Sequence, residues 1–150
     1  MGMTGRRLLP TLLGLALVGL LALLRLADPL PVATLRDLWF QPTFHKHVGR
    51  LCNGVFIHAE GAAYDHDAFR PWRLQTLAFK AIRKLYGDYD LWRDFAYEYV
   101  FDKLAIDVIN GGPNLREWVD DAAALPGDLD SLTVPDEAVW AEVRRPHLLY

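Results

Sequence analysis

The stretch of residues 41–58 constrains the fold more than any other part of this 150-residue chain. It holds three of the five histidines, two glycines and the single cysteine. β-branched residues recur at every second position near its end, and this period of two predicts a short strand over Cys52–His58. A turn is expected near Gly49. If His45 and His47 are extended as well, their imidazoles share one face of a strand.

The N-terminus has the layout of a leader. Two arginines at positions 6 and 7 precede an apolar run over residues 8–24, which is the order found in secretory signals. The uninterrupted part, residues 12–24, is shorter than the ~20 residues of a membrane span. Residues 1–33 are therefore expected to be a signal peptide or an N-terminal membrane anchor, and residues 34–150 one domain. The protein would then be extracytoplasmic, either secreted or membrane-anchored. A wrongly assigned start codon is the alternative.

Charge excludes one class of partner. Residues 1–33 hold three of the 16 basic residues and one of the 19 acidic residues, so residues 34–150 carry a net charge of −5. Nucleic-acid binding needs clustered Lys and Arg, and no such block is present, so no nucleic-acid partner is expected. A single cysteine cannot form an internal disulfide, and no cofactor is predicted.

Apolar spacing predicts an α+β fold, with a small, mostly antiparallel sheet and helices packed on it. Strands are expected over residues 35–44, 52–58 and 95–101. The clearest helix covers residues 71–86, with Pro71 in its first turn. Its apolar stripe consists of Leu74, Leu77, Ala78, Ala81, Ile82 and Leu85.

The second half of the chain gives weaker signals. Residues 104–109 fit a short helix or a strand. Asn114 can cap a helix over residues 115–123, with Trp118, Val119 and Ala122 facing inward. Residues 126–135 are expected to be a loop, and residues 136–145 a last helix.

Six pieces of sequence, in order, carry a resemblance to a known family. They are Pro42-Thr-Phe-His-Lys-His47, Asn53-Gly-Val-Phe-Ile-His58, Phe69-Arg-Pro71, Tyr97-Glu-Tyr99, Lys103-Leu-Ala-Ile-Asp107 and Leu148-Leu-Tyr150. The chain resembles the C-terminal domain of bacterial exo-β-N-acetylmuramidases, glycoside hydrolases that trim N-acetylmuramic acid from peptidoglycan fragments. Family members carry a larger Rossmann-like catalytic domain before this one, and it is missing from this sequence. Ala105 stands where the family usually has proline, and Val100 where it has an acid.

The resemblance implies sugar chemistry, for which glycosidases normally need two carboxyl groups. Glu98, set among aromatic residues, is the candidate catalytic carboxyl, and Asp107 is the second candidate, assigned to substrate binding. A separate catalytic domain would supply the other half of the cleft. The alternative for Glu98 is a structural acid, hydrogen-bonded to the backbone or paired with Lys103 or Arg93.

The other candidate substrate-binding residues are His45, His47, His58, Arg70 and Tyr97. Glu98 is expected within about one side-chain length of one of these histidines, on an open face. The lactyl carboxylate of muramic acid could bind Arg50, Arg70 or a histidine. A zinc site formed by the three histidines is an alternative, but the prediction is that no metal is bound.

Three functions remain open from the sequence. The first is the auxiliary part of an exo-muramidase, acting on peptidoglycan or muropeptide sugars and attached to the membrane through the leader. The second is a non-enzymatic module that binds cell-wall sugars or proteins. The third is a small complete enzyme that uses Glu98 and a histidine.

Overall fold

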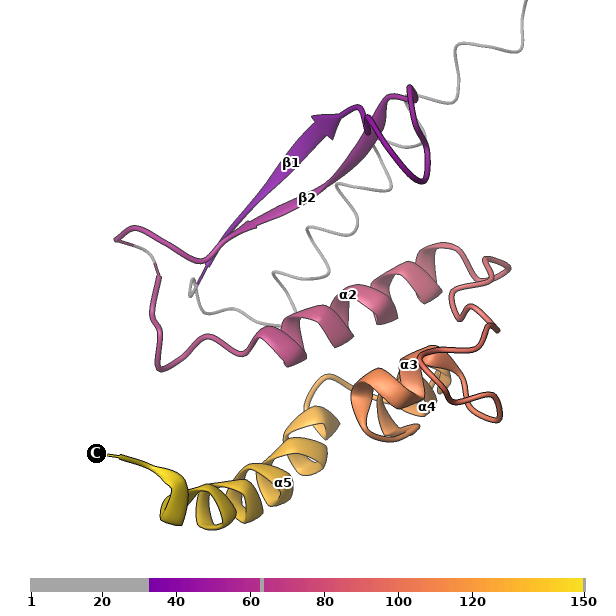
Figure 1. Cartoon of the computed structure of the whole chain (residues 1–150). Helices are drawn as coiled ribbons and strands as arrows, with labels where there is room; N and C mark the ends of the chain where they lie inside the picture. The colour runs from indigo at the N-terminus through magenta and orange to yellow at the C-terminus, as the bar shows by residue number, and fades with distance from the viewer. Residues whose placement is uncertain (1–32, 63, 150) are drawn as a thin grey trace, which may run out of the picture. The chain divides into compact units, whose positions relative to one another are not determined.

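The computed structural model describes residues 33–62 and 64–149, and the chain divides into two units, Met1–Gly87 and Asp88–Tyr150. In the first unit, strands β1 (Thr34–Phe40) and β2 (Cys52–His58) precede helix α2 (Pro71–Leu85) (Figure 1). The second unit contains α3 (Ala105–Asn110), α4 (Asn114–Asp120), α5 (Asp128–Arg144) and the 3₁₀ helix η1 (Arg145–His147). The predicted α+β class is confirmed. The expected leader, apart from residue 33, lies outside the described residues.

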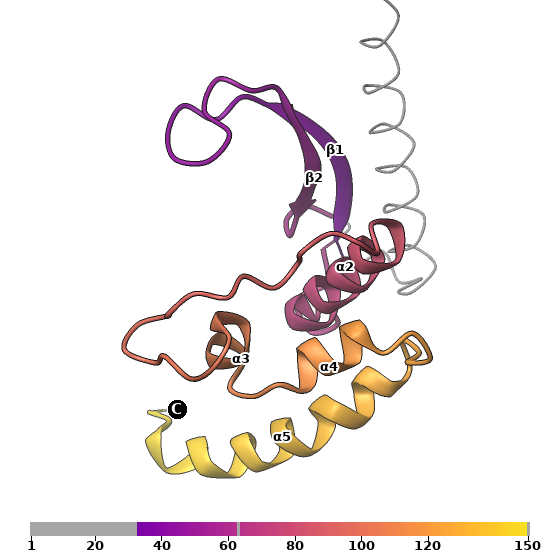
Figure 2. The ribbon, with the colours of Figure 1, turned by 90° about the vertical axis from the view of Figure 1, so that its right-hand side faces the viewer.

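The two strands form an antiparallel hairpin in which Thr34 pairs with His58 and Phe40 with Cys52. Figures 1 and 2 show the strands side by side along their whole length. Strand β1 ends at Phe40 and not at residue 44, because the chain then enters a loop. The backbone N–H of Gly49 closes this loop by donating to the carbonyl of Pro42 at 3.1 Å. The turn expected near Gly49 is therefore confirmed.

A glycine lets an aromatic ring lie against the hairpin. A Cβ atom at Gly54 would lie 3.3 Å from an edge carbon of the Phe40 ring, which is tighter than ordinary van der Waals contact. The ring can take this position because residue 54 has no side chain. Gly54 is directly opposite Leu38, and Phe40 reaches it from the diagonal position on the same face.

Helix α2 follows its sequence signals closely. Pro71 occupies the first turn, two basic residues occupy the last, and the helix ends at Leu85. Leu77 is 4% exposed, and Leu74, Thr76 and Ala81 are also buried, so the predicted stripe is confirmed in the middle of the helix. Leu85 was expected to be buried but is exposed, because it is the last residue of the helix.

The second unit has a core of its own in α3, α4 and the start of α5. The buried residues are Ala105, Leu115, Trp118, Val119 and Leu129. The inward positions predicted for Trp118 and Val119 are confirmed. Ala122 is exposed, because α4 ends at Asp120 and not at residue 123.

Helix α5 begins eight residues before its expected start, so the prediction of a loop over residues 126–135 is wrong. The carboxylate of Asp128, the first helical residue, accepts the backbone N–H of Leu125 in the preceding segment at 2.7 Å. Pro135 lies inside the helix and removes one main-chain hydrogen bond. The ribbon of α5 is curved in Figure 2, as a proline in a helix leads one to expect.

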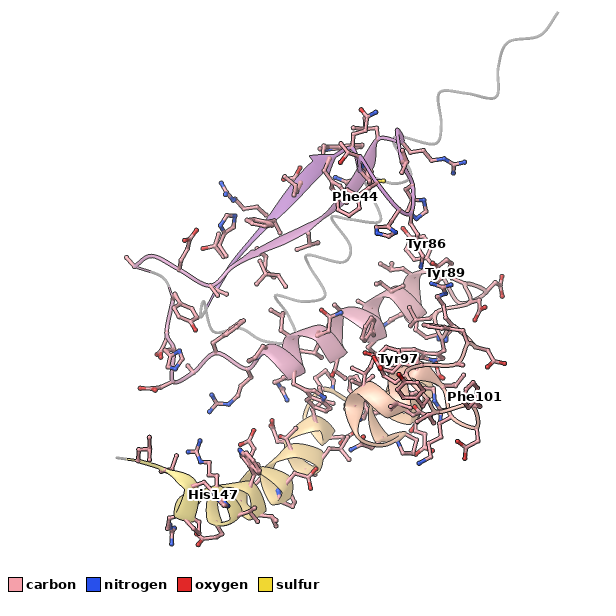
Figure 3. All side chains as sticks on the ribbon, viewed as in Figure 1. Phe44, Tyr86, Tyr89, Tyr97, Phe101 and His147 are labelled. Atoms are coloured by element: carbon pink, nitrogen blue, oxygen red, sulfur yellow. The ribbon has the colours of Figure 1, made fainter. Side chains whose placement is uncertain are left out.

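Residues 95–101 do not form the predicted strand. Tyr97 and Val100 exchange backbone hydrogen bonds of 3.3 and 3.1 Å and close a tight turn around Glu98 and Tyr99. Glu98 has φ +53°, which reverses the chain direction and ends the alternation. Figure 3 labels Tyr97, at the start of this turn, and Phe101, which follows it.

Candidate functional site

A hollow of about 480 Å³ opens in the second unit. It is bordered by the Tyr97–Val100 turn, the segment before α3, the α3–α4 loop and the side of α4. Its lining residues are Val100, Lys103, Asp107, Val108, Gly111, Gly112, Pro113, Arg116 and Glu117. We call it the α3–α4 cleft.

The loop between α3 and α4 gives the cleft a fixed floor. Helix α3 ends at Asn110 and is capped by Gly111, whose φ of +80° is the left-handed conformation that glycine adopts most easily. The amide of Asn110 donates to the carbonyl of Gly112 at 2.9 Å and to Oδ1 of Asn114 at 2.6 Å. The same Asn114 oxygen accepts the backbone N–H of Leu115 at 2.9 Å. These bonds tie the end of one helix to the start of the next.

An ion pair spans the cleft wall from α3 to α4. Nε of Arg116 donates to Oδ1 and Oδ2 of Asp107 at 2.9 and 3.1 Å, and Nη2 donates to Oδ2 at 2.7 Å. The side chains are 12% exposed for Asp107 and 25% for Arg116. Hydrogen bonding to Asp107 raises the pKa of Arg116, although partial burial opposes this. The pair occupies one edge of the guanidinium, so Nη1 is free of bonds within the described residues.

The charges that line the cleft cancel. Lys103 and Arg116 are cationic, and Asp107 and Glu117 are anionic. The side chains of Lys103 and Glu117 form no ion pair or hydrogen bond within residues 33–62 and 64–149, so their charged groups can bind a ligand. Val100, Val108 and Pro113 add apolar surface. A neutral lining with donors, acceptors and small apolar patches suits a hydroxyl-rich, uncharged group such as a sugar ring.

The candidate residues Glu98 and Tyr97 do not line this cleft but belong to the turn that ends at Val100. Val100 lines the cleft and closes the turn that carries both residues. Glu98 is exposed and, in the part of the chain that the structure describes, pairs with neither Lys103 nor Arg93. Arg93 instead lies over the Phe95 ring, 4.8 Å from its centre. Tyr97 is half-buried, whereas Tyr99 is 89% exposed.

His45 and His47 lie in the loop between the strands and have φ values of +57° and +61°. The prediction that they extend a strand and share a face is therefore wrong, because the backbone reverses at each of them. Both side chains are exposed. The His45 ring has an edge contact with Phe44, with 5.2 Å between the ring centres.

His58 is the most enclosed of the three candidate histidines, with 14% of its side chain exposed. Its Nε2 atom accepts hydrogen bonds from Arg36, and its Nδ1 atom lies 3.4 Å from Oε1 of Glu60. Arg70 has a local role, since its Nη1 donates to the carbonyl of Asp67 at 2.6 Å. That bond holds the segment that leads into α2.

The candidate residues fall into both units. The first contains His45, His47, His58 and Arg70, and the second contains Tyr97, Glu98 and Asp107. The expected approach of Glu98 to a histidine stays a prediction. Sequence reasoning missed Arg116 and Glu117 as site residues, and it also missed Arg36. The Gly-Gly-Pro loop between Asp107 and Arg116 was the one available signal for the cleft.

The part of the chain that the structure describes, residues 33–62 and 64–149, has no group of three or more His, Cys, Asp or Glu residues placed to hold a metal ion. It also has no helix long and apolar enough to cross a membrane.

The match to known proteins covers most of the chain. Residues 19–150 match the family described as the C-terminal part of the exo-β-N-acetylmuramidase NamZ. The chain belongs to this family. The match begins inside residues 1–33, and the domain boundary expected there stays a prediction.

One relative shows how the NamZ C-terminal family relates to a longer protein. The peptidoglycan β-N-acetylmuramidase NamZ of Bacillus subtilis is 28% identical over 123 residues, which cover 81% of this chain and 26% of the relative. The chain therefore spans about a quarter of that protein's length. No solved structure matches the chain. Family membership supports the prediction that this chain is an auxiliary domain of a muramidase.

Proposed function

We propose that this chain is an exported or membrane-anchored auxiliary domain that binds a peptidoglycan sugar beside a separate muramidase catalytic domain. Backbone strain is the observation that carries the proposal. Among the described residues, the non-glycine positions with positive φ are His45, His47 and Glu98. Each was a candidate site residue from sequence alone. Strained backbone costs about 1–3 kcal/mol per residue and concentrates at functional sites.

The α3–α4 cleft is the proposed sugar-binding site. Its fixed Asp107–Arg116 pair leaves Nη1 of Arg116 available as a donor, and Lys103 and Glu117 provide a further donor and acceptor. Sugars are bound by a few oriented polar groups beside apolar or aromatic surface. The acetamido methyl group of an N-acetylated sugar would pack on Val108 or Pro113.

Glu98 is proposed to provide one carboxyl group from the turn next to the cleft. Glycoside hydrolysis normally needs two carboxyl groups on either side of the bond, and the catalytic domain would provide the other. The chain alone should therefore not turn over a chromogenic muramoside. Turnover by the purified chain, abolished by Glu98→Gln, would instead identify a small complete enzyme.

Sugar binding can be measured through the glycines of the cleft floor. The backbone N–H signals of Gly111 and Gly112 should shift saturably when the full chain is titrated with N-acetylglucosamine or N-acetylmuramic acid. Lys103→Gln and Glu117→Gln should each weaken binding about tenfold, because each removes a hydrogen bond to a charged group. Glu142→Gln, on the exposed part of α5, is the matched control. Unshifted glycine signals, or cleft variants that bind like the control, would refute the site.

Export is proposed from the apolar run after two arginines. Mass spectrometry of the protein recovered from its host would show whether residues 1–33 are removed. Recovery from the cytoplasm with the leader intact would contradict export.

A further inference from the structure

Arg36 and His58 form a second polar cluster, on the hairpin of the first unit. Thr34 pairs with His58 and Arg36 with Phe56, so Arg36 and His58 are diagonal neighbours on one face of the sheet. The Nε and Nη2 atoms of Arg36 lie 2.9 and 2.6 Å from Nε2 of His58. We call these two residues the Arg36–His58 pair.

The contacts hold the imidazole in place. Two guanidinium N–H groups of Arg36 point at Nε2 of His58, which accepts them. The other ring nitrogen, Nδ1, lies 3.4 Å from Oε1 of Glu60. The Phe56 ring packs edge-on against the imidazole, with 4.3 Å between the centres. Three neighbours thus fix His58, and His58 fixes Arg36.

The guanidinium of Arg36 is a cation without a carboxylate partner in the described part of the chain. His58 occupies its Nε–Nη2 edge, which leaves the Nη1–Nη2 edge open in an exposed residue. An open edge of this kind binds a carboxylate through two parallel hydrogen bonds. Leu38 and Phe56, both exposed on the same face, offer apolar surface beside it.

We infer that the Arg36–His58 pair is a carboxylate-binding site in which Arg36 contacts the ligand and His58 is a positioning residue. The inference rests on the proposed function for the choice of ligand, a muramic sugar with its lactyl carboxylate. It is independent of the α3–α4 cleft, because the two sites lie in different units and use different groups.

Three small molecules distinguish binding of the carboxylate from binding of the sugar ring. N-acetylmuramic acid carries both, D-lactate carries only the acid, and N-acetylglucosamine carries only the sugar. The Nε–H signal of Arg36 in the full chain should shift with the first two probes and not with the third. The signals of Gly111 and Gly112 report the cleft in the same titration, so failure of one site is distinguishable from failure of the other.

Variants test the role of each residue. Because the Arg36 variants lose the guanidinium signal, D-lactate binding by all variants is followed at the backbone N–H of Phe56, the residue that pairs with Arg36. Arg36→Gln should abolish the shift of this signal. Arg36→Lys keeps the charge but loses the planar fork, so it should weaken binding about tenfold. Lys46→Gln removes the same charge from the exposed loop of the same unit and should bind normally. His58→Gln can still accept from Arg36 and should bind D-lactate, whereas His58→Leu should not.

Several results would overturn the inference. These are an Arg36 signal that ignores D-lactate, or one that responds to inorganic phosphate but not to N-acetylmuramic acid. Equal losses in Lys46→Gln and Arg36→Gln would show a general charge effect. Normal D-lactate binding by a folded His58→Leu protein would remove the positioning role of His58.

Discussion

Breaking the Asp107–Arg116 pair should destabilise the second unit and deform the α3–α4 cleft. The pair makes three hydrogen bonds and is 12% and 25% exposed. Exposed ion pairs contribute ~0.2–1 kcal/mol, and removing one partner of a fully buried pair costs ~3–5 kcal/mol. For this partly buried, bidentate pair we expect a coupling of about 2 kcal/mol.

The measurement is a double-mutant cycle with Asp107→Asn, Arg116→Gln and the double variant, followed by urea unfolding. The exposed pair of Arg145 and Glu142, at 2.7 Å, is the internal control and should show a coupling of about 0.2–0.5 kcal/mol. A coupling for Asp107 and Arg116 no larger than that of the control would refute the reasoning.

The pKa of Arg116 predicts how the contribution of the ion pair to stability depends on pH. Because the folded state raises the pKa of Arg116, its contribution is fully present below the pKa of the unfolded chain. It is lost only as the pH rises through the still higher folded value. The contribution of Arg116 to stability should therefore be constant between about pH 6 and pH 9. A loss of coupling within that window would mean that another group controls the pair.

The other predictions concern stability. Leu77→Ala should cost about 2–5 kcal/mol in unfolding free energy, because the side chain is almost fully buried; a loss below about 1 kcal/mol would show that the stripe of α2 is not packed. Gly111→Ala should cost about 1–2 kcal/mol, since its φ is +80°, whereas Gly127→Ala should cost less because Gly127 has φ −66° and open space around it. Glu98→Gly should raise stability by about 1 kcal/mol through relief of strain but weaken binding of the muramoyl sugar; a gain in both would argue against a functional carboxylate at Glu98.

Local signals predicted the hairpin and α2 well, because their residues interact mainly within a short stretch of chain. Cys52–His58 has the strand period, and Pro71 and the apolar stripe define α2. The turn at residues 97–100 was missed because it contains neither glycine nor asparagine, the usual signals of a reversal. The predicted last helix began eight residues too late, because Pro135 was interpreted as a helix boundary. The helix accepts this proline at the loss of one hydrogen bond.

The candidate site was predicted less completely, for a physical reason. Asp107 was identified by its motif, but its partner Arg116 is nine residues away on another helix. No period links the two residues, because the Asn110–Asn114 loop sets their approach. Arg36 and His58 are 22 residues apart and meet only through the register of the hairpin. The sequence indicates which side chains carry charge, whereas the loops and the register determine which of them meet.

The hairpin also determines where the protein is most prone to aggregate. Within the described residues the sheet contains only β1 and β2, so each strand has an outer edge able to pair with another chain. In β1, Arg36 and Asp37 place charges that oppose such pairing. Strand β2 has no Asp, Glu, Lys or Arg and contains the run Val55-Phe-Ile57, a composition that favours cross-β stacking. Aggregation during refolding should therefore begin at β2, and the substitution Asn53→Lys should delay it.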